Sequence, residues 1–420
     1  MAVERESNKI SADEVFETIK EIEIFRETLV EGQNPNYIIK NKKNNKYLKM
    51  NSQEYFIFDL LNNSKNLVQI SEAYFIEYHK IAIDYISCFI LRLMNAGFIK
   101  NYEPKKETKQ VLEIKLPLKK LKDIYQYLYC KIGNKILEFY KWKLVLYILF
   151  CFTGIVLYFL YKPDIEVSMT KALLISFSIA FIIPMFLHEI SHAMMVMHYG
   201  REVFDSGFML YFFMPVFYVN TTDMWMSGRK ERVIVDLAGI ISDLLCGSLF
   251  SIVLWFDISP QVDFICYQNM IITYMRVILN LNPLLKWDGY YVLMDALGCS
   301  NLKEEGTSLL KKCCKDIRKV FKLGLKDRVL LGYAVMSSAY ICYFMYRLFT
   351  IKALKSVKVI LNGDLFNVSL STWFDIFMMI LMVIMLVKNL HSACSKAKMW
   401  LINHVLIIKK AQRRTKDERV

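Results

Sequence analysis

The chain has no CxxC pair, although ten cysteines occur among its 420 residues. Cys313 and Cys314 are adjacent and lack metal-ligand spacing, and no cysteine falls in a segment expected outside the cell. All ten are expected to be reduced thiols, which excludes a disulfide framework. The first residues, MAVERESNKISADEVFETIK, also lack the apolar run of a signal peptide. We therefore expect the N-terminal part to stay in the cytoplasm.

Hydrophobic residues, in contrast, are abundant. They make up 55% of the chain, and the mean hydropathy is +0.28. This is too apolar for an ordinary soluble protein, and apolar runs dominate from Leu144 onward. We predict a mainly α-helical, polytopic membrane protein preceded by a soluble domain. Six spans are expected, at 144–161, 172–197, 233–256, 264–283, 329–349 and 373–388.

The placement of positive charge bears on the class of partner. The net charge is +14, and Lys and Arg concentrate in the segments 198–232, 296–328 and the tail from 388. These segments lie inside the cell if the N-terminus does, so the positive-inside rule accounts for the charge and nucleic acid is not an expected partner. We expect a multi-pass plasma-membrane protein with both termini cytoplasmic. The run KKAQRR (409–414) is expected at lipid headgroups, with a plain solvated tail as the alternative.

The spacing of hydrophobic residues changes along residues 36–101, so this segment is not expected to form one helix. YIIKNKKNNKYLKM is typical of a hairpin, and SQEYFIFDLLNN predicts a helix behind an N-cap at Ser52. Two more helices follow and end at Gly97. A hairpin with three helices predicts a small α/β winged-helix-like domain, to whose strand edge a peptide can add.

Four parts are thus expected along the chain. Residues 1–110 form the cytosolic winged-helix-like domain. Residues 111–143 contain a strand and a basic amphipathic helix that lies along the inner membrane face. Residues 144–390 form the six-span domain, and residues 391–420 form a basic cytosolic tail.

The sequence MFLHEISHAM (185–194) puts ionisable groups in one of the most apolar segments. His188 and His192 are four residues apart, so on a helix both rings project from one face and can bind one ion. Glu189 can then reach a water on that ion. The alternative is a pair of core histidines beside a structural glutamate, but ionisable groups at membrane depth favour a functional role.

Two histidines leave a catalytic zinc site incomplete, because such sites take three protein ligands and a water. Asn282-Pro283 breaks a later span, and Asp288 follows at the depth expected for the histidines. We assign Asp288 as the third ligand. His198 is the rival, but ten residues beyond His188 it falls on another side of the helix.

These motifs resemble the site-2 protease family of intramembrane zinc metalloproteases. HEISH and NPLLKWDG carry the resemblance, and GFMLYFFMPVFYVNTTDMW (207–225) and RKERVIVDLAG (229–239) are similar to the bacterial branch named for peptide zinc metalloproteases. MNSQEYFIFDLLNN is similar to the PqqD-like domain that many members carry at the N-terminus. The resemblance covers nearly the whole chain beyond residue 36.

The resemblance implies one zinc ion per chain, held by His188, His192 and Asp288, with Glu189 as the base. It also implies that the aromatic stretch 207–220 is a membrane-associated β-hairpin that presents substrate as an extended strand. Substrate-binding or oxyanion roles are expected for Asn282, Asp243 and Tyr218. Family members often read AGPxxN where this chain reads AGIISD, so Asp243 would need to be protonated to replace the family asparagine.

The expected function is zinc-dependent cleavage of a peptide within or beside the membrane, in the maturation or export of a ribosomally made peptide. The expected partners are a precursor peptide, the lipid bilayer and a peptide exporter. One alternative is a non-proteolytic export or immunity protein with a structural metal. A membrane-anchored transcription regulator is a weaker alternative, because residues 36–101 lack an arginine-rich helix at base-reading spacing.

Overall fold

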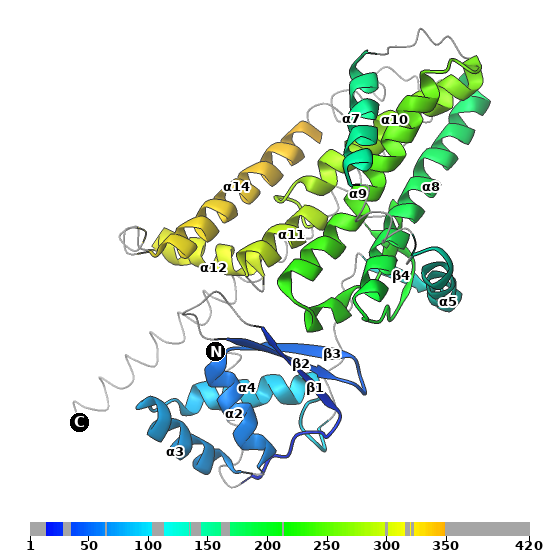
Figure 1. Cartoon of the computed structure of the whole chain (residues 1–420). Helices are drawn as coiled ribbons and strands as arrows, with labels where there is room; N and C mark the ends of the chain where they lie inside the picture. Colours follow the sequence, from blue (N-terminus) through cyan, green and yellow to red (C-terminus); the bar gives the residue numbers. More distant parts are fainter. Residues whose placement is uncertain are drawn as a thin grey trace, which may run out of the picture. The chain divides into compact units, whose positions relative to one another are not determined.

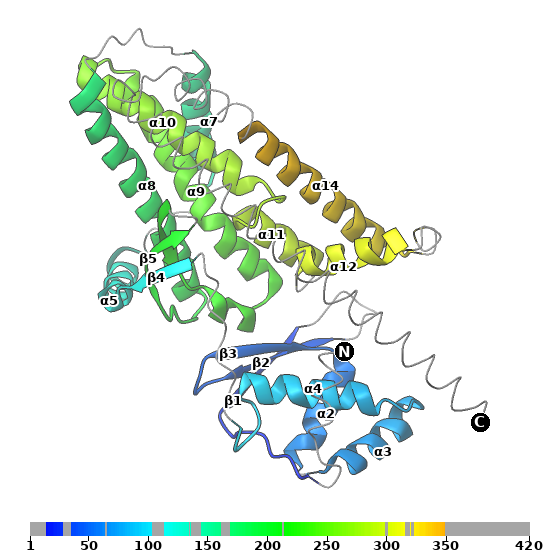
Figure 2. The same cartoon turned by 180° about the vertical axis from the view of Figure 1, so that it is seen from behind.

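The computed structural model describes residues 14–27, 35–63, 65–102, 113–133, 135, 144–160, 169–211, 214–298, 301–315, 320 and 323–348. The expected span 373–388 and the tail 391–420 lie outside the described residues. The chain divides into two compact units, residues 1–305 and 306–420. The N-terminal domain and the HEISH helix therefore belong to the same unit (Figures 1 and 2).

The N-terminal domain is a three-stranded antiparallel sheet packed with three helices. Its strands β1 (Ile22–Glu27), β2 (Asn36–Asn41) and β3 (Lys46–Met50) pair in the order β1-β2-β3. The helices α2 (Ser52–Asn62), α3 (Leu67–Tyr78) and α4 (Ile83–Ala96) follow. The sequence predicted the β2–β3 hairpin and the helices but not β1.

Local side-chain hydrogen bonds fix the ends of these elements. Asn51, and not the expected Ser52, is the N-cap of α2: its side chain accepts from the backbone of Glu54, whose carboxylate accepts in return from Asn51. The helix α4 ends at Gly97, whose φ of 76° lies in the left-handed region that glycine adopts without strain. One hydrophobic core joins the sheet to the helices through buried residues such as Ile39 and Ile57.

A second sheet follows the linker. The strand β4 (Glu113–Pro117) pairs with β5 (Ser206–Tyr211), which pairs with β6 (Met214–Val219), all antiparallel. The expected strand and hairpin are both present, and β4 occupies one edge of the hairpin. Between β4 and β5 run α5 (Lys119–Leu128), the π-helical turn η1 (Tyr129–Gly133), α7 (Leu144–Leu160) and α8 (Met169–His198).

The remaining helices of the first unit pack around α9. After the 3₁₀ turn η2 (Thr222–Met226) come α9 (Arg229–Leu254), α10 (Pro260–Leu281) and α11 (Asp288–Leu297). Figures 1 and 2 show α7 to α10 side by side. The helix α12 (Leu302–Lys315) crosses into the second unit, where its Gly306 packs closely against Leu330 of α14 (Leu325–Leu348).

Within the described residues, one helix is long and apolar enough to cross a membrane, namely α9. The apolar helix Val145–Leu160 is shorter. The expected span 172–197 falls within the helix α8, and the expected spans 264–283 and 329–349 overlap the helices α10 and α14. The molecule is thus mostly helical with two small sheets, and its crossing the membrane several times remains a prediction.

Candidate metal centre

The two histidines of HEISH lie one turn apart on α8, and their rings meet edge to face with centroids 4.7 Å apart. His188 is 5% exposed and His192 is 7% exposed. Pro184 lies inside the same helix. The helical spacing places both rings on the face of α8 that packs against α9.

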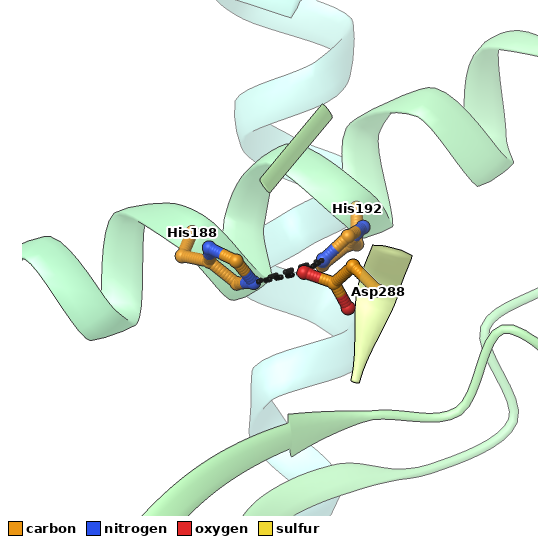
Figure 3. A group of neighbouring side chains, drawn as sticks. All are labelled: His188, His192 and Asp288. Atoms are coloured by element: carbon orange, nitrogen blue, oxygen red, sulfur yellow. Dashed lines mark hydrogen bonds and ion pairs between the residues drawn. The ribbon is translucent and has the colours of Figure 1, made fainter. Parts of the chain in front are cut away.

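Asp288 reaches the histidines because the chain turns sharply after α10. That helix ends at Asn282, whose side-chain oxygen accepts a 3.0 Å bond from the backbone of Leu284. Gly289 lets the turn close, since a Cβ there would lie 2.6 Å from the Leu281 carbonyl oxygen. Asp288 Oδ2 lies 3.1 Å from His188 Nε2 and 3.7 Å from His192 Nε2 (Figure 3).

The hydrogen bonds behind the rings fix which nitrogen of each histidine faces the cluster. His192 Nδ1 lies 2.7 Å from the Val235 carbonyl oxygen, which can only accept, so this nitrogen carries the proton. His188 Nδ1 lies 2.9 Å from Asp243 Oδ2 and donates in the same way. Both Nε2 atoms of the neutral rings therefore present lone pairs, 3.1 Å apart.

The cluster consequently has three acceptors directed at one point. Asp288 Oδ2 is buried and makes no hydrogen bond. Buried acceptors that lack a donor are costly, and a cation between them removes the cost. Tetrahedral zinc with bonds of about 2.0–2.1 Å sets its ligand atoms about 3.3 Å apart, close to the separations found here. The residues fit a zinc ion, and they form a group whose ligand atoms lie within 4.8 Å of one another.

Gly239 of α9, which has no side chain, faces the cluster. A Cβ at Gly239 would lie 2.4 Å from His192 Nε2 and 2.5 Å from His188 Nε2. Any larger residue would occupy the space that an ion needs. The sequence analysis did not assign this glycine a role, because only the packing of α9 against α8 reveals it.

Glu189 follows His188 on α8 and is half-buried. Its carboxylate interacts electrostatically with both histidines and with Asp288. The buried Tyr125 of α5 also lies within electrostatic reach of Glu189. Glu189 is thus a carboxylate within electrostatic reach of the cluster that could exchange a proton with a bound water.

Asp243 occupies a different position from the one expected of a substrate-binding residue. It is fully buried behind His188, and Arg276 Nη2 lies 3.2 Å from its second oxygen. The side-chain amide of Asn280 donates a weaker 3.4 Å bond to Asp243 Oδ2, the oxygen that faces His188. The arrangement makes Asp243 the partner that orients the ring of His188. Arg276 was missed from the sequence, although a charged residue in an apolar helix was a usable signal.

The other expected site residues lie apart from the cluster. Asn282 is used in the turn after α10. Tyr218 of β6 donates a 3.1 Å bond to Asp205, and Lys115 of β4 lies over its ring. His198 ends α8, and its ring packs edge to face against Tyr199. Among the described residues, the metal-ligand group contains His188, His192 and Asp288 without His198.

Comparison with known proteins gives one partial match. No protein-family model matches the chain, and no solved structure matches it significantly. A segment of 117 residues is 30% identical to the "Putative peptide zinc metalloprotease protein YydH" of Bacillus subtilis (strain 168). The match covers 28% of this chain and 45% of that protein, so the chain spans less than half the length of this relative.

Proposed function

We propose that the chain is a zinc-dependent endopeptidase of the site-2 protease type, which cleaves a peptide within or beside a membrane. The observation that carries the proposal is the convergence of three acceptor atoms on one point beside Glu189. The similarity to a protein named as a peptide zinc metalloprotease supports it.

The proposed reaction divides the chemistry among named residues. A zinc ion held by His188, His192 and Asp288 would lower the pKa of a bound water toward about 7 and polarise a peptide carbonyl. Glu189 accepts the proton of the attacking water and returns it to the leaving amine. Asp243 keeps His188 in the tautomer that a metal ligand needs.

The second sheet suggests how substrate is held. Helical substrates hide their carbonyls in hydrogen bonds, so cleavage requires an extended strand. Among the described strands of this sheet, β4 and β6 are the two edges, because β5 pairs with both. The strand β6 also packs against α8, which carries Glu189. We propose that substrate adds to β6.

The cellular setting is a further part of the proposal. We propose that the protein lies in the plasma membrane with several crossings and cytoplasmic termini, and α9, which is long and apolar enough for one crossing, supports the membrane location. We propose that the N-terminal domain binds the leader of a ribosomally made peptide, which an exporter partner then carries out. A pull-down in which residues 1–110 ignore every precursor peptide of the source genome would count against this step.

The substitution Glu189→Gln tests the reaction in the full chain purified in detergent. We expect zinc content to stay at one ion per chain while cleavage of an internally quenched peptide library falls by about 10²–10⁴-fold. The control Glu202→Gln changes an exposed glutamate just beyond α8 and should leave zinc content and peptide cleavage unchanged. Full cleavage by Glu189→Gln would contradict the proposal and favour an export or immunity protein with a structural metal.

A further inference from the structure

A buried carboxylate of the N-terminal domain lies between a lysine of its own sheet and two arginines of α9. Glu27, the last residue of β1, is 3% exposed. Its Oε1 accepts bonds of 2.7 Å from Arg232 and 3.2 Å from Arg229, both in the first turn of α9. Lys49 of β3 lies 3.4 Å from the other oxygen. Three cations thus surround this buried carboxylate, and removing one partner of a buried ion pair is strongly destabilising.

Arg232 joins three elements through one guanidinium. Its Nη2 donates to Glu27 of β1, its Nε donates to Asp295 of α11 at 2.7 Å, and its Nη1 donates to the Ser227 carbonyl at 2.9 Å. The side chain is 6% exposed. A planar fork with fixed donor directions holds its acceptors in one geometry, which a lysine cannot do.

Asp295 connects this network to the metal cluster. The helix α11 begins at Asp288 and carries Asp295 seven residues later, close to two full turns and on the same face. A helix of this length is stiff, so a carboxylate fixed at its last turn restrains the one at its first. Gly298 ends the helix with its Cα close to Arg229, which also contacts Glu27.

A second contact shows that β1 is not the sole point of attachment. Asp223, in the turn η2 just before α9, is 2% exposed. It accepts a 2.7 Å bond from Lys40 of β2 and a 2.6 Å bond from Tyr47 of β3. Two independent buried ion pairs therefore attach the sheet of the N-terminal domain to the segment that leads into α9.

We propose that Arg232 is a positioning residue that couples the docked N-terminal domain, through Glu27, to the metal ligand Asp288. The domain is then a fixed part of the peptidase, and its docking sets the geometry of the metal cluster. This inference rests on the proposed function, because it assumes that Asp288 binds zinc.

The test compares Glu27→Gln and Asp295→Asn with the wild type in the full chain. We expect zinc affinity, measured by competition with a chromophoric chelator, to fall by about 10-fold in each of the two variants. This is the low end of the losses seen when residues that support metal ligands are changed. The absorption spectrum of the cobalt-substituted protein should change in band position, which reports altered ligand geometry. Arg232→Lys should give the same spectral change, since it keeps the charge and loses the fork.

The matched control is Glu17→Gln, which removes an exposed ion pair with Lys100 in the same domain. It should leave affinity and spectrum at wild-type values. Wild-type affinity and spectrum in folded Glu27→Gln and Asp295→Asn would overturn the coupling while leaving the peptidase proposal intact. If the wild type itself bound no stoichiometric zinc, the proposed function would fail instead. Should Glu27→Gln not fold, Glu27→Asp keeps the charge and must show an intermediate affinity.

Discussion

At the scale of single residues, the metal cluster depends as much on a missing side chain as on the three ligands. Gly239 leaves the lone pairs of both histidines open to a common point. Behind the rings, the Val235 carbonyl and Asp243 hold the protons on the far nitrogens. The cluster can therefore accept a cation without rearranging its ligands, and preorganisation of this kind raises affinity.

Gly239→Ala should remove the metal while leaving the fold in place. The added Cβ would lie 2.4 Å from His192 Nε2, so the ring or the helix must shift out of ligand geometry. We expect zinc affinity to fall by at least about 10-fold, measured by chelator competition. The control is Gly332→Ala in α14, where an added Cβ meets nothing within 4 Å. Tight zinc binding by Gly239→Ala would show that the ion binds at a site other than this cluster.

The sequence was informative about residues wherever spacing along one helix decides the geometry. His188 and His192 converge because four residues make about one turn. Asp288 followed from the helix break at Asn282-Pro283, which brought a distant carboxylate to the expected depth. Asp243 and Arg276 could not be placed this way, since their roles depend on how α9 and α10 rotate against α8. A pattern of residue types contains no information on that rotation.

At the scale of elements, the strand β4 ties the linker to the hairpin. The backbone of β4 passes so near β5 that a Cβ at Gly207 would lie 2.2 Å from the Leu116 carbonyl oxygen. Leu118 donates a 2.8 Å backbone bond to Ser206 at the same place. With β4 in position, β5 is the central strand of this sheet, and β4 and β6 form its edges.

Gly207→Val should separate β4 from the hairpin. Overpacking of this kind costs about 1–3 kcal/mol, which corresponds to a rise of about 10-fold in hydrogen exchange at the β4 amides. Mass spectrometry of a peptide covering Lys115 and Leu118 measures the exchange. Met209→Val, two residues along the same strand, should leave these amides protected. Unchanged exchange in Gly207→Val would show that β4 does not depend on this close approach.

The amphipathic segment after β4 forms the helix α5, whose surroundings the sequence pattern does not determine. Its basic and aromatic pattern predicted a helix, and α5 is present. The same pattern was interpreted as a surface helix on the membrane. The structure buries Tyr125 of α5 in a core with Ile190 and Val196 of α8, while Ile124 and Tyr127 stay exposed, so the location along the membrane stays a prediction. An apolar helix face fits either a lipid surface or a protein neighbour, so the pattern alone cannot choose between them.

At the scale of the whole molecule, the N-terminal domain is docked through acids whose protonation is linked to docking. Burial alone would raise the pKa of Glu27, but the hydrogen bond from Arg232 and the charges of Lys49 and Arg229 outweigh it and lower the pKa to about 2. The pKa of Asp223 is also lowered: burial raises it, and the backbone amide of Glu202 and Lys40 more than compensate. Both acids thus favour docking when ionised.

The direction of the pH dependence follows from the lowered pKa of Glu27. Its ordinary value is 4.5, so its contribution to docking is fully present above about pH 4.5 and is lost as the pH falls toward about 2. The buried Asp295, which shares Arg232, has a raised pKa because of its burial and opposes this trend. Glu27 and Asp223 favour docking when they are ionised, and Asp295 opposes it. We therefore expect docking to be weaker in acid, between pH 4.5 and 2.

Trp225 provides a signal for this transition, because its ring packs edge to face on Tyr47 of the docked sheet. In a chain whose other tryptophans are replaced by Phe, we expect its emission to shift to the red as the pH falls from 4.5 to 2. Glu27→Gln should remove most of that pH dependence, because the substituted side chain does not titrate, whereas the exposed Glu17→Gln should keep the wild-type profile. A transition centred above pH 6, or one that survives unchanged in Glu27→Gln, would mean that a group other than this carboxylate controls docking.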